Sequence, residues 1–337
     1  MQNKHSVAIV GASGMVGRKF LEILEEIDLN IDRLYLFASK RSAGNKLTFK
    51  NQEITILELS EENIKNRHID YALFSAGGSI SLEYAPVFAK YGAVVIDNSS
   101  AWRMQEEIPL IVPEVNPQAA FNHKGIIANP NCSTIQSVLP LQVLKALYGL
   151  KSISFTTYQA VSGSGMNGIA DLNRTQKGEE ANFYPYSIHN NILPQIDIFL
   201  DNGYTKEEMK MVEETRKILE LPELEISATC CRVPISNCHS VSMHIELERE
   251  FDIETIKSAM ETFPGITLLD NVEDKIYPLA SIANNTNDVY VGRIRRDCSN
   301  PKKLHLFCVA DNIRKGAATN TVQIAKLLMD RKNITQE

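Results

Sequence analysis

The sequence predicts an α/β protein whose first half is a doubly wound, largely parallel sheet. A short apolar segment at residues 7–10 enters a glycine-rich turn and then an amphipathic helical segment. Short apolar segments then alternate with polar or helical ones up to residue 129, the pattern of strands joined by crossovers. The chain has 337 residues, 44% of them hydrophobic, which is enough for two domains.

The first turn indicates a nucleotide site. Its glycines, Gly11, Gly14 and Gly17, have a spacing that lets the backbone approach a phosphate at a helix N-terminus. A glycine-rich turn without a ligand is the alternative. The following segment has helical periodicity in its apolar residues Val16, Phe20, Ile23, Leu24 and Ile27.

The second strand, expected at residues 33–39, bears on the choice of cofactor. It ends in Ser39, Lys40, Arg41 and Ser42, where an NAD-specific site usually has an acidic residue about 20 residues past the glycines. An arginine and two hydroxyls suit a 2′-phosphate, so the sequence favours NADP over NAD. A solvated basic turn is the alternative.

Further strands are expected at residues 54–58, 71–78, 93–100 and 125–129, with helical segments at 61–67 and 81–91. Ligands of doubly wound sheets bind at the carboxyl ends of the strands. We therefore expect residues 75–78 and 97–100 beside the cofactor.

A cysteine follows the last of these strands, in "NPNCSTIQ". Cys132 would begin a helix that ends before Gly149 and is bent at Pro140. The helix N-terminus favours the thiolate, and Asn131 can supply an amide donor beside it. Cys132 is thus a candidate nucleophile, with a buried, space-filling cysteine as the alternative.

A nucleophilic cysteine beside a nicotinamide suggests attack on an acyl carbon followed by hydride exchange, which needs an acid/base partner. His239 is the best candidate among seven histidines. It starts an alternating strand in which the residues of the same parity are Val241, Met243, Ile245 and Leu247.

Other polar residues lie near these segments in the sequence. Arg232 can clamp a carboxylate, although the residues alone slightly favour a surface ion pair. Gln159 ends what looks like a buried row of an extended segment, and the loop after it contains Ser162, Gly163 and Gly165, which allow close approach to a ring.

Composition excludes several classes. A net charge of −6 argues against a broad nucleic-acid or anionic-membrane surface, and no apolar run approaches the ~18–20 residues of a membrane span. We expect a cytoplasmic protein. Six irregularly spaced cysteines do not form a disulfide framework. A zinc site at Cys230, Cys231, Cys238 and His239 is disfavoured because no CxxC pair is present, so we expect no metal.

Taken in order, the motifs resemble the aspartate-β-semialdehyde dehydrogenase family over nearly the whole chain. They are "GASGMVG", "ASKRSAGNKL", "DNSSAWRM", "VPEVN", "NPNCSTIQ", "YQAVSGSG", "LPQID", "CCRVPISNCHS" and "VADNIRKGAATN". The resemblance implies reversible, NADP-dependent reductive dephosphorylation of L-4-aspartyl phosphate to L-aspartate 4-semialdehyde. This reaction belongs to lysine, methionine, threonine and diaminopimelate biosynthesis.

The resemblance also implies roles for individual residues. Cys132 would be the acyl-enzyme nucleophile, His239 the acid/base, Gln159 an orienter of the intermediate and Arg232 the clamp for the substrate carboxylate. The phosphate and substrate would be held by Arg103, Lys210, Asn131 and Glu207. For Glu207 and Lys210, an exposed helical ion pair is the alternative.

The resemblance also implies two domains. The first is a Rossmann-like NADP-binding domain at residues 1–128, completed by a helix in 313–337. The second is an α+β catalytic and dimerisation domain with a mixed sheet at 129–312. Self-association would give a homodimer, with a tetramer left open. The expected cofactor contacts are Gly11, Ser13, Gly14, Met15, Val16, Ser39, Arg41, Ser42, Ala76, Gly77, Ser162, Gly163 and Asn312.

Two rival functions are retained. N-acetyl-γ-glutamyl-phosphate reductase shares the cofactor and the chemistry, but the residues from Gln159 to Arg232 and the "RKGAATN" segment favour the aspartate enzyme. The other rival is a catalytically silent NADP-binding or scaffold protein. The joint presence of Cys132, Gln159, Arg232 and His239 counts against it.

Overall fold

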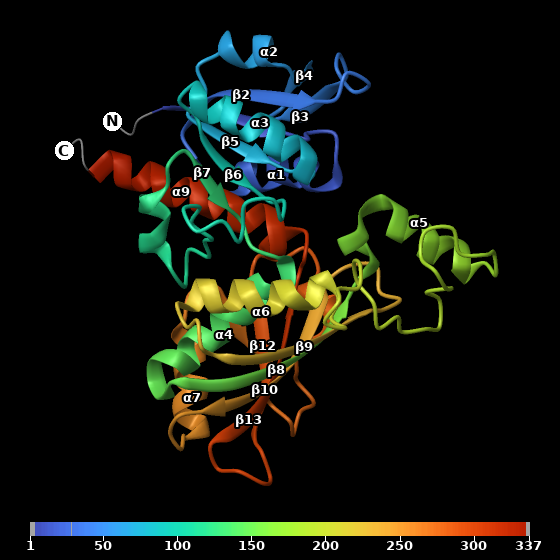
Figure 1. Ribbon diagram of the computed structural model, residues 1–337, viewed down its shortest axis with the longest axis vertical. Coiled ribbons are helices and arrows are strands. Elements are labelled where there is room, and N and C mark those ends of the chain that lie inside the picture. The colour runs from blue at the N-terminus through green and yellow to red at the C-terminus, as the bar shows by residue number, and fades with distance from the viewer. Residues whose placement is uncertain (1–3, 28, 335–337) are drawn as a thin grey trace. The chain divides into compact units, whose positions relative to one another are not determined.

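The computed structural model describes residues 4–27 and 29–334 (Figure 1). The chain forms two compact units, Met1–Pro130 with Ala317–Glu337, and Asn131–Gly316. Each unit is built around its own sheet. In the described residues, no helix is long and apolar enough to cross a membrane.

The first unit contains a seven-stranded sheet in the order β3-β4-β2-β1-β5-β6-β7. All neighbours are parallel except β3 and β4. The order reverses between β1 and β5, so their carboxyl ends form the crevice where a nucleotide binds in such sheets. The strands are β1 (His5–Val10), β2 (Ile31–Ala38), β3 (Lys46–Phe49), β4 (Gln52–Glu58), β5 (Tyr71–Phe74), β6 (Val94–Asp97) and β7 (Ile126–Ala128).

Helices cover both faces of this sheet, and the central strands β1 and β5 are therefore buried on both sides. On one face, Val7 and Ile9 of β1 pack in one core cluster with residues of α1 (Met15–Glu26) and α9 (Thr319–Ile334). On the other face, Phe88 of α3 (Gly78–Lys90) packs edge-on against Phe37 and Phe74. The shorter helices are α2 (Glu61–Lys65) and the 3₁₀ helix η1 (Pro117–Asn122).

The second unit contains a six-stranded mixed sheet in the order β11-β12-β13-β10-β8-β9. The β8–β9 and β11–β12 pairs are parallel, and the others are antiparallel. The strands are β8 (Leu150–Gln159), β9 (Glu225–Arg232), β10 (His239–Leu247), β11 (Ile266–Leu268), β12 (Val289–Arg296) and β13 (Lys303–Ala310).

The longer helices that contact this sheet are α4 (Cys132–Tyr148), α6 (Lys206–Leu219) and α7 (Ile253–Thr262), and a short helix, α8 (Ala280–Ala283), contacts β13. The burial of β10 alternates as expected, because His239, Val241, Met243, Ile245 and Leu247 are all buried and the residues between them are partly exposed. The remaining elements are η2 (Val161–Ser164), α5 (Gly165–Gln176) and a π-helical turn at Arg314–Ala318.

The α/β fold with a doubly wound sheet is confirmed, as is the mixed sheet of the second unit. The helix from Cys132 ends before Gly149, whose φ of 74° is readily adopted only by glycine. The sequence did not reveal the β3–β4 hairpin, because its turn is made by Lys50 and Asn51 at φ of 46° and 63° rather than by a typical Asn-Gly pair.

Candidate active site

The glycine turn of the first unit brings backbone unusually close to backbone. Gly11 has a φ of 87°, and a Cβ there would lie 2.3 Å from the carbonyl oxygen of Ser75 at the end of β5. A Cβ on Gly17 would lie 2.2 Å from the carbonyl oxygen of Gly11. Only glycine fits at both places, so α1 begins directly over the crevice between β1 and β5.

A cavity of about 380 Å³ opens at this crevice. Its lining includes five of the expected cofactor residues, Gly11, Ser13, Gly14, Ser39 and Ala76. It also includes Ser75, from the segment expected beside the cofactor, and five residues that the sequence did not single out: Ala38, Leu59, Ile80, Glu83 and Tyr84. Arg41 is exposed just beyond Ser39, at the end of β2.

In the second unit, Asn131 caps the helix that starts with Cys132. Its side-chain oxygen accepts hydrogen bonds from the backbone N–H groups of Ser133 at 2.9 Å and Thr134 at 3.3 Å. Asn131 is buried, whereas Cys132 is partly exposed. The cysteine therefore occupies the first position of a capped, 17-residue helix.

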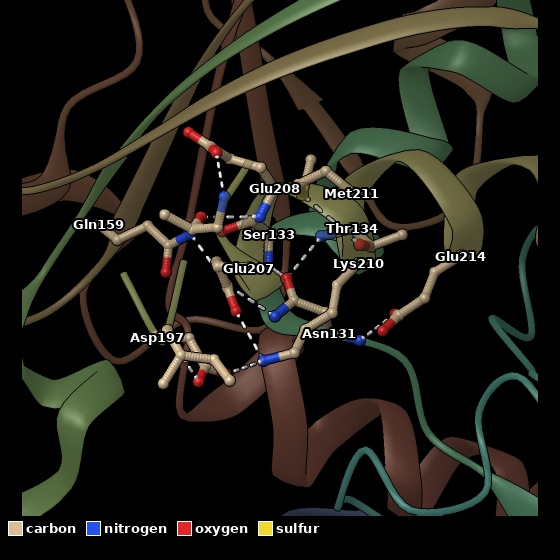
Figure 2. Close-up of polar contacts among 12 residues, drawn as sticks. Asn131, Ser133, Thr134, Gln159, Asp197, Glu207, Glu208, Lys210, Met211 and Glu214 are labelled. Carbon is tan, nitrogen blue, oxygen red and sulfur yellow. Dashed lines mark hydrogen bonds and ion pairs between the residues drawn. The ribbon is translucent and has the colours of Figure 1, made fainter. Parts of the chain in front are cut away.

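A buried polar network adjoins this helix start (Figure 2). Oε1 of Glu207 accepts from the side-chain amides of Asn131 at 2.8 Å and Gln159 at 3.1 Å. Its Oε2 lies 3.0 Å from Nζ of Lys210, which also contacts Asp197 at 3.0 Å. Glu207 is only 4% exposed, so the alternative of an exposed helical pair is wrong, although the two residues do form an ion pair.

The charges of this network are mutually stabilised. Burial alone would raise the pKa of Glu207, but the charge of Lys210 and the amide hydrogen bonds lower it to about 2. Burial would lower the pKa of Lys210, but Glu207 and Asp197 raise it. Glu207 therefore stays ionised, and Gln159 is held with its amide nitrogen on that carboxylate.

His239 is fully buried at the start of β10. Its Nδ1 accepts a hydrogen bond from the backbone N–H of Ala160 at 3.0 Å, and its Nε2 has no hydrogen-bond partner in the described structure. Since an amide N–H can only donate, the neutral ring carries its hydrogen on Nε2. Burial and then the nearby charge of Arg232 lower the pKa of His239 to about 3.

Arg232 ends β9 and is 4% exposed, so the surface ion pair expected from the residues alone is wrong. Its Nη1 donates to the carbonyl oxygen of Ala160 at 2.7 Å, while its Nε lacks a partner in the described structure. A Cβ on Gly163 would lie 2.8 Å from Nη1 of Arg232 and 3.1 Å from Nε2 of His239. The glycine thus keeps space open beside both side chains.

A second glycine opens space beside Cys132. A Cβ on Gly316 would lie 2.8 Å from Cβ of Cys132. Gln136, one turn after Cys132, donates from its side-chain amide to the carbonyl oxygen of His239 at 3.1 Å. The helix of Cys132 and the strand of His239 are thereby tied together inside one unit.

Three further expected residues, Ser162, Asn312 and Arg103, have hydrogen-bond partners within their own units. Asn312 bonds the hydroxyl of Ser162 and accepts from the backbone N–H of Cys238 at 2.9 Å. Arg103, in the first unit, is buried and donates to the backbone oxygens of Asn129 at 2.9 Å and Asn98 at 2.7 Å, beyond the ends of β7 and β6.

Comparison with known proteins identifies the family. Residues 6–123 match the semialdehyde dehydrogenase NAD binding domain, and residues 140–315 match the semialdehyde dehydrogenase dimerisation domain. The aspartate-semialdehyde dehydrogenase of Aquifex aeolicus is 51% identical, with 96% of this chain and 98% of the relative covered. The Bacillus subtilis protein of the same name is 48% identical, with 96% of both chains covered.

The chain belongs to the aspartate-semialdehyde dehydrogenase family. Its fold agrees, since a crystal structure of aspartate semialdehyde dehydrogenase II from Vibrio cholerae, complexed with ASA, superposes with a TM-score of 0.93 at 42% identity. That match covers 97% of this chain and 99% of the other. As a member of this family, the protein is an oxidoreductase of amino-acid biosynthesis with a nicotinamide-cofactor domain, a self-associating domain and small-molecule substrates.

One cluster in the described residues was considered as a metal site. Among the described residues, the group with ligating atoms close enough for an ion is His244, Asp297 and His305. The two imidazole rings are stacked at 4.4 Å with an interplanar angle of 6°. Lone pairs that lie in parallel planes cannot converge on one ion, so this geometry is that of a stacked pair beside a carboxylate.

Proposed function

We propose that the protein catalyses the reversible, NADP-dependent reductive dephosphorylation of L-4-aspartyl phosphate to L-aspartate 4-semialdehyde. The product would feed lysine, methionine, threonine and diaminopimelate synthesis. The observation that carries this proposal is the position of Cys132. It is a partly exposed thiol at the first residue of a capped helix. The same unit holds the buried His239, whose ring accepts a hydrogen bond at Nδ1 and has no partner at Nε2 among the described residues.

Cys132 is the nucleophile of this mechanism. Its sulfur attacks the acyl carbon, the bond to phosphate breaks, and a thioester forms on the enzyme. When bound, the reduced nicotinamide would supply a hydride to the thioester carbon, which gives the thiohemiacetal as its oxyanion. The thiohemiacetal then collapses to the aldehyde and returns the electron pair to the sulfur of Cys132. The helix N-terminus favours that developing negative charge.

We assign His239 the acid/base role. In the reductive direction its Nε2–H donates a hydrogen bond to the substrate oxygen that gains negative charge. Gln159 orients the intermediate, because its amide is fixed by the ionised Glu207. These two groups would act on the acyl carbon from the carboxyl end of β8 and the start of β10.

The substrate is a small anion with a carboxylate and a phosphate. Arg232, whose Nε has no partner in the described structure, is proposed to bind the carboxylate. Lys210, Arg103 and Asn131 would bind the phosphate, with Glu207 completing the substrate site. Buried or half-buried positions for these charged groups support that assignment.

For the cofactor, we propose NADP rather than NAD, with the 2′-phosphate at Ser39, Arg41 and Ser42. The cavity over Gly11 and Gly14 supports a dinucleotide there. The remaining contacts would come from Ser13, Met15, Val16, Ala76, Gly77, Ser162, Gly163 and Asn312.

For the larger organisation, we propose that residues 1–128 with 313–337 form the NADP-binding domain and residues 129–312 the catalytic and dimerisation domain. The working form would be a homodimer, with a tetramer left to be tested. All six cysteines are thiols, which fits a reducing cytoplasm.

The deciding experiment is the absorbance of reduced nicotinamide on mixing the protein with NADP, phosphate and L-aspartate 4-semialdehyde. N-acetyl-glutamate semialdehyde is the parallel substrate. Phosphate-dependent reduction with the aspartate compound alone is expected. Activity only with the acetylated compound would transfer the same residues to the arginine-pathway reductase. Silence with both, despite NADP binding, would favour the scaffold protein.

A further inference from the structure

One helix directs two carboxyl groups at the residue that precedes the nucleophile (Figure 2). Glu207 and Glu214 are both on α6, seven residues apart, which places them two turns apart on one face. Glu207 accepts from the side-chain amide of Asn131 at 2.8 Å. Glu214 accepts from the backbone N–H of the same residue at 2.6 Å. Asn131 is therefore hydrogen-bonded to α6 through both its side chain and its backbone.

The Glu214 contact is buried, and the helices around it are closely packed. Glu214 is 1% exposed, and Met211, between the two glutamates on α6, accepts from the hydroxyl of Thr134 at 3.5 Å. Burying a carboxyl group is unfavourable unless strong hydrogen bonds compensate for lost hydration, and a short bond from a backbone N–H is of that kind. The main chain at Asn131 is thus tied to α6 by a specific acceptor.

This tie reaches the nucleophile through the cap. Asn131 has an extended backbone with φ −60° and ψ 143°, and from there its side-chain oxygen reaches the N–H groups of Ser133 and Thr134. A rotation of this backbone would move the cap and the start of the helix together. Cys132 lies between the anchored residue and the capped ones, so its sulfur is aimed by the same contacts.

We propose that Glu214 is a positioning residue for the nucleophile: by accepting the Asn131 N–H, it fixes the backbone that aims the thiol of Cys132 at the acyl carbon. The inference rests on the proposed function for the identity of the reaction. Glu214 contacts no substrate in this mechanism and acts through Asn131. Misplacing a reacting group by about 1 Å can lower a rate about 100-fold, so the effect is expected in kcat.

The test compares three variants in a Cys298→Ser background, which removes the exposed thiol. Glu214→Met fills the space without an acceptor, and Glu214→Gln keeps an amide oxygen that can accept. Glu213→Met changes the exposed neighbour on the same helix and is the matched control. For each variant we would measure the rate of Cys132 alkylation by iodoacetamide across pH 6–10, kcat and KM for the forward reaction, NADP affinity and the melting temperature.

Glu214→Met is expected to lower kcat and to change the Cys132 alkylation rate by about tenfold or more, with NADP affinity unchanged. In Glu214→Gln, kcat and the alkylation rate should both stay within about threefold of the parent. Glu213→Met should match the parent in both quantities. A merely structural role would lower the melting temperature while leaving kcat per folded enzyme and alkylation unchanged. That result in Glu214→Met would overturn the proposal, and so would an equal loss in Glu214→Gln, because placement rather than charge is claimed.

If Glu214→Met does not fold, Glu214→Asp decides, because it withdraws the carboxyl group by one methylene. Parent-like kcat and alkylation in Glu214→Asp would reject the positioning role. The alkylation measurement needs no substrate. If the parent enzyme fails to turn over aspartate semialdehyde, the proposed function fails, while the dependence of Cys132 reactivity on Glu214 is still decided.

Discussion

The backbone N–H of Ala160 lies 3.0 Å from Nδ1 of His239 and donates to it. This contact holds the hydrogen of the neutral ring on Nε2, because Nδ1 can then only accept. We expect ¹⁵N NMR of histidine-labelled protein at pH 7 to show His239 as the neutral Nε2–H tautomer.

The assignment would come from the loss of one ring signal in His239→Gln. A His239 signal typical of imidazolium, or of hydrogen on Nδ1, would contradict the tautomer and with it the donor role at Nε2.

The lowered pKa of His239 predicts how stability depends on pH. The ring charges near pH 6.5 in the unfolded chain but only near pH 3 in the folded protein, so the unfolded state binds the extra proton between these values. The contribution of the neutral His239 ring to the free energy of unfolding is therefore fully present above about pH 6.5 and is lost as the pH falls toward 3. In urea unfolding, His239→Gln should lose less stability than the wild type between pH 7 and pH 4.5.

The other ionisable groups are common to both proteins, so their contributions to stability cancel in the difference between the two curves. Parallel stability curves for the wild type and His239→Gln would show that His239 titrates normally.

Cys132, the proposed nucleophile, and the glycine turn at Gly11 lie in different compact units, so a mutation of one should leave the role of the other intact. Cys132→Ala should abolish turnover and leave NADP affinity within about twofold, because the thiol supplies covalent chemistry and not nucleotide binding. Steady-state kinetics measures the turnover, and titration with NADP measures the affinity. Turnover at the wild-type rate would refute the acyl-enzyme.

Gly316 is predicted to be required for the geometry of Cys132. A methyl group there would lie 2.8 Å from Cβ of Cys132, closer than carbon atoms pack, so the cysteine has to shift. We expect Gly316→Ala to lower kcat about tenfold or more, with a smaller effect on NADP affinity. Wild-type kcat would mean that the helix absorbs the methyl group without moving the thiol.

Arg41 is expected to select the cofactor. Arg41→Ala should weaken NADP binding about tenfold or more and NAD binding much less, because a 2′-phosphate is present only in NADP. Fluorescence titration with both nucleotides is the measurement, and Lys40→Ala, which removes the adjacent exposed cation, is the control. Equal losses for both nucleotides in Arg41→Ala would remove the 2′-phosphate assignment.

Local patterns explain what the sequence predicted well. The helix start at Cys132 follows from a capping Asn131 and a terminal Gly149, both of which act within one or two turns. The same holds for Gly11 and Gly17, where local backbone geometry demands glycine. These features could be predicted because the residues that determine them are neighbours in the chain.

The burial of charged residues could not be predicted in this way. One partner of Glu207 is Asn131, 76 residues away, and the backbone oxygen that holds Arg232 belongs to Ala160, 72 residues away. Glu214 gave no signal at all, because the sequence around it is rich in glutamate and lysine and reads as an exposed helix. The partner that buries such a side chain is specified only by the tertiary fold.

Helix α9 has a consequence for how the protein is made. Val322, Ile324 and Ala325 belong to the same core cluster as Val7 and Ile9 of the first strand, more than 300 positions earlier in the chain. A ribosome would deliver the nucleotide sheet first and its covering helix last, after the whole second unit. Until then the part of this apolar face that α9 covers stays exposed beside α1, so the nascent chain offers a docking surface to chaperones while the second unit is made. Truncating the gene before α9 should therefore yield aggregates rather than a smaller nucleotide-binding protein.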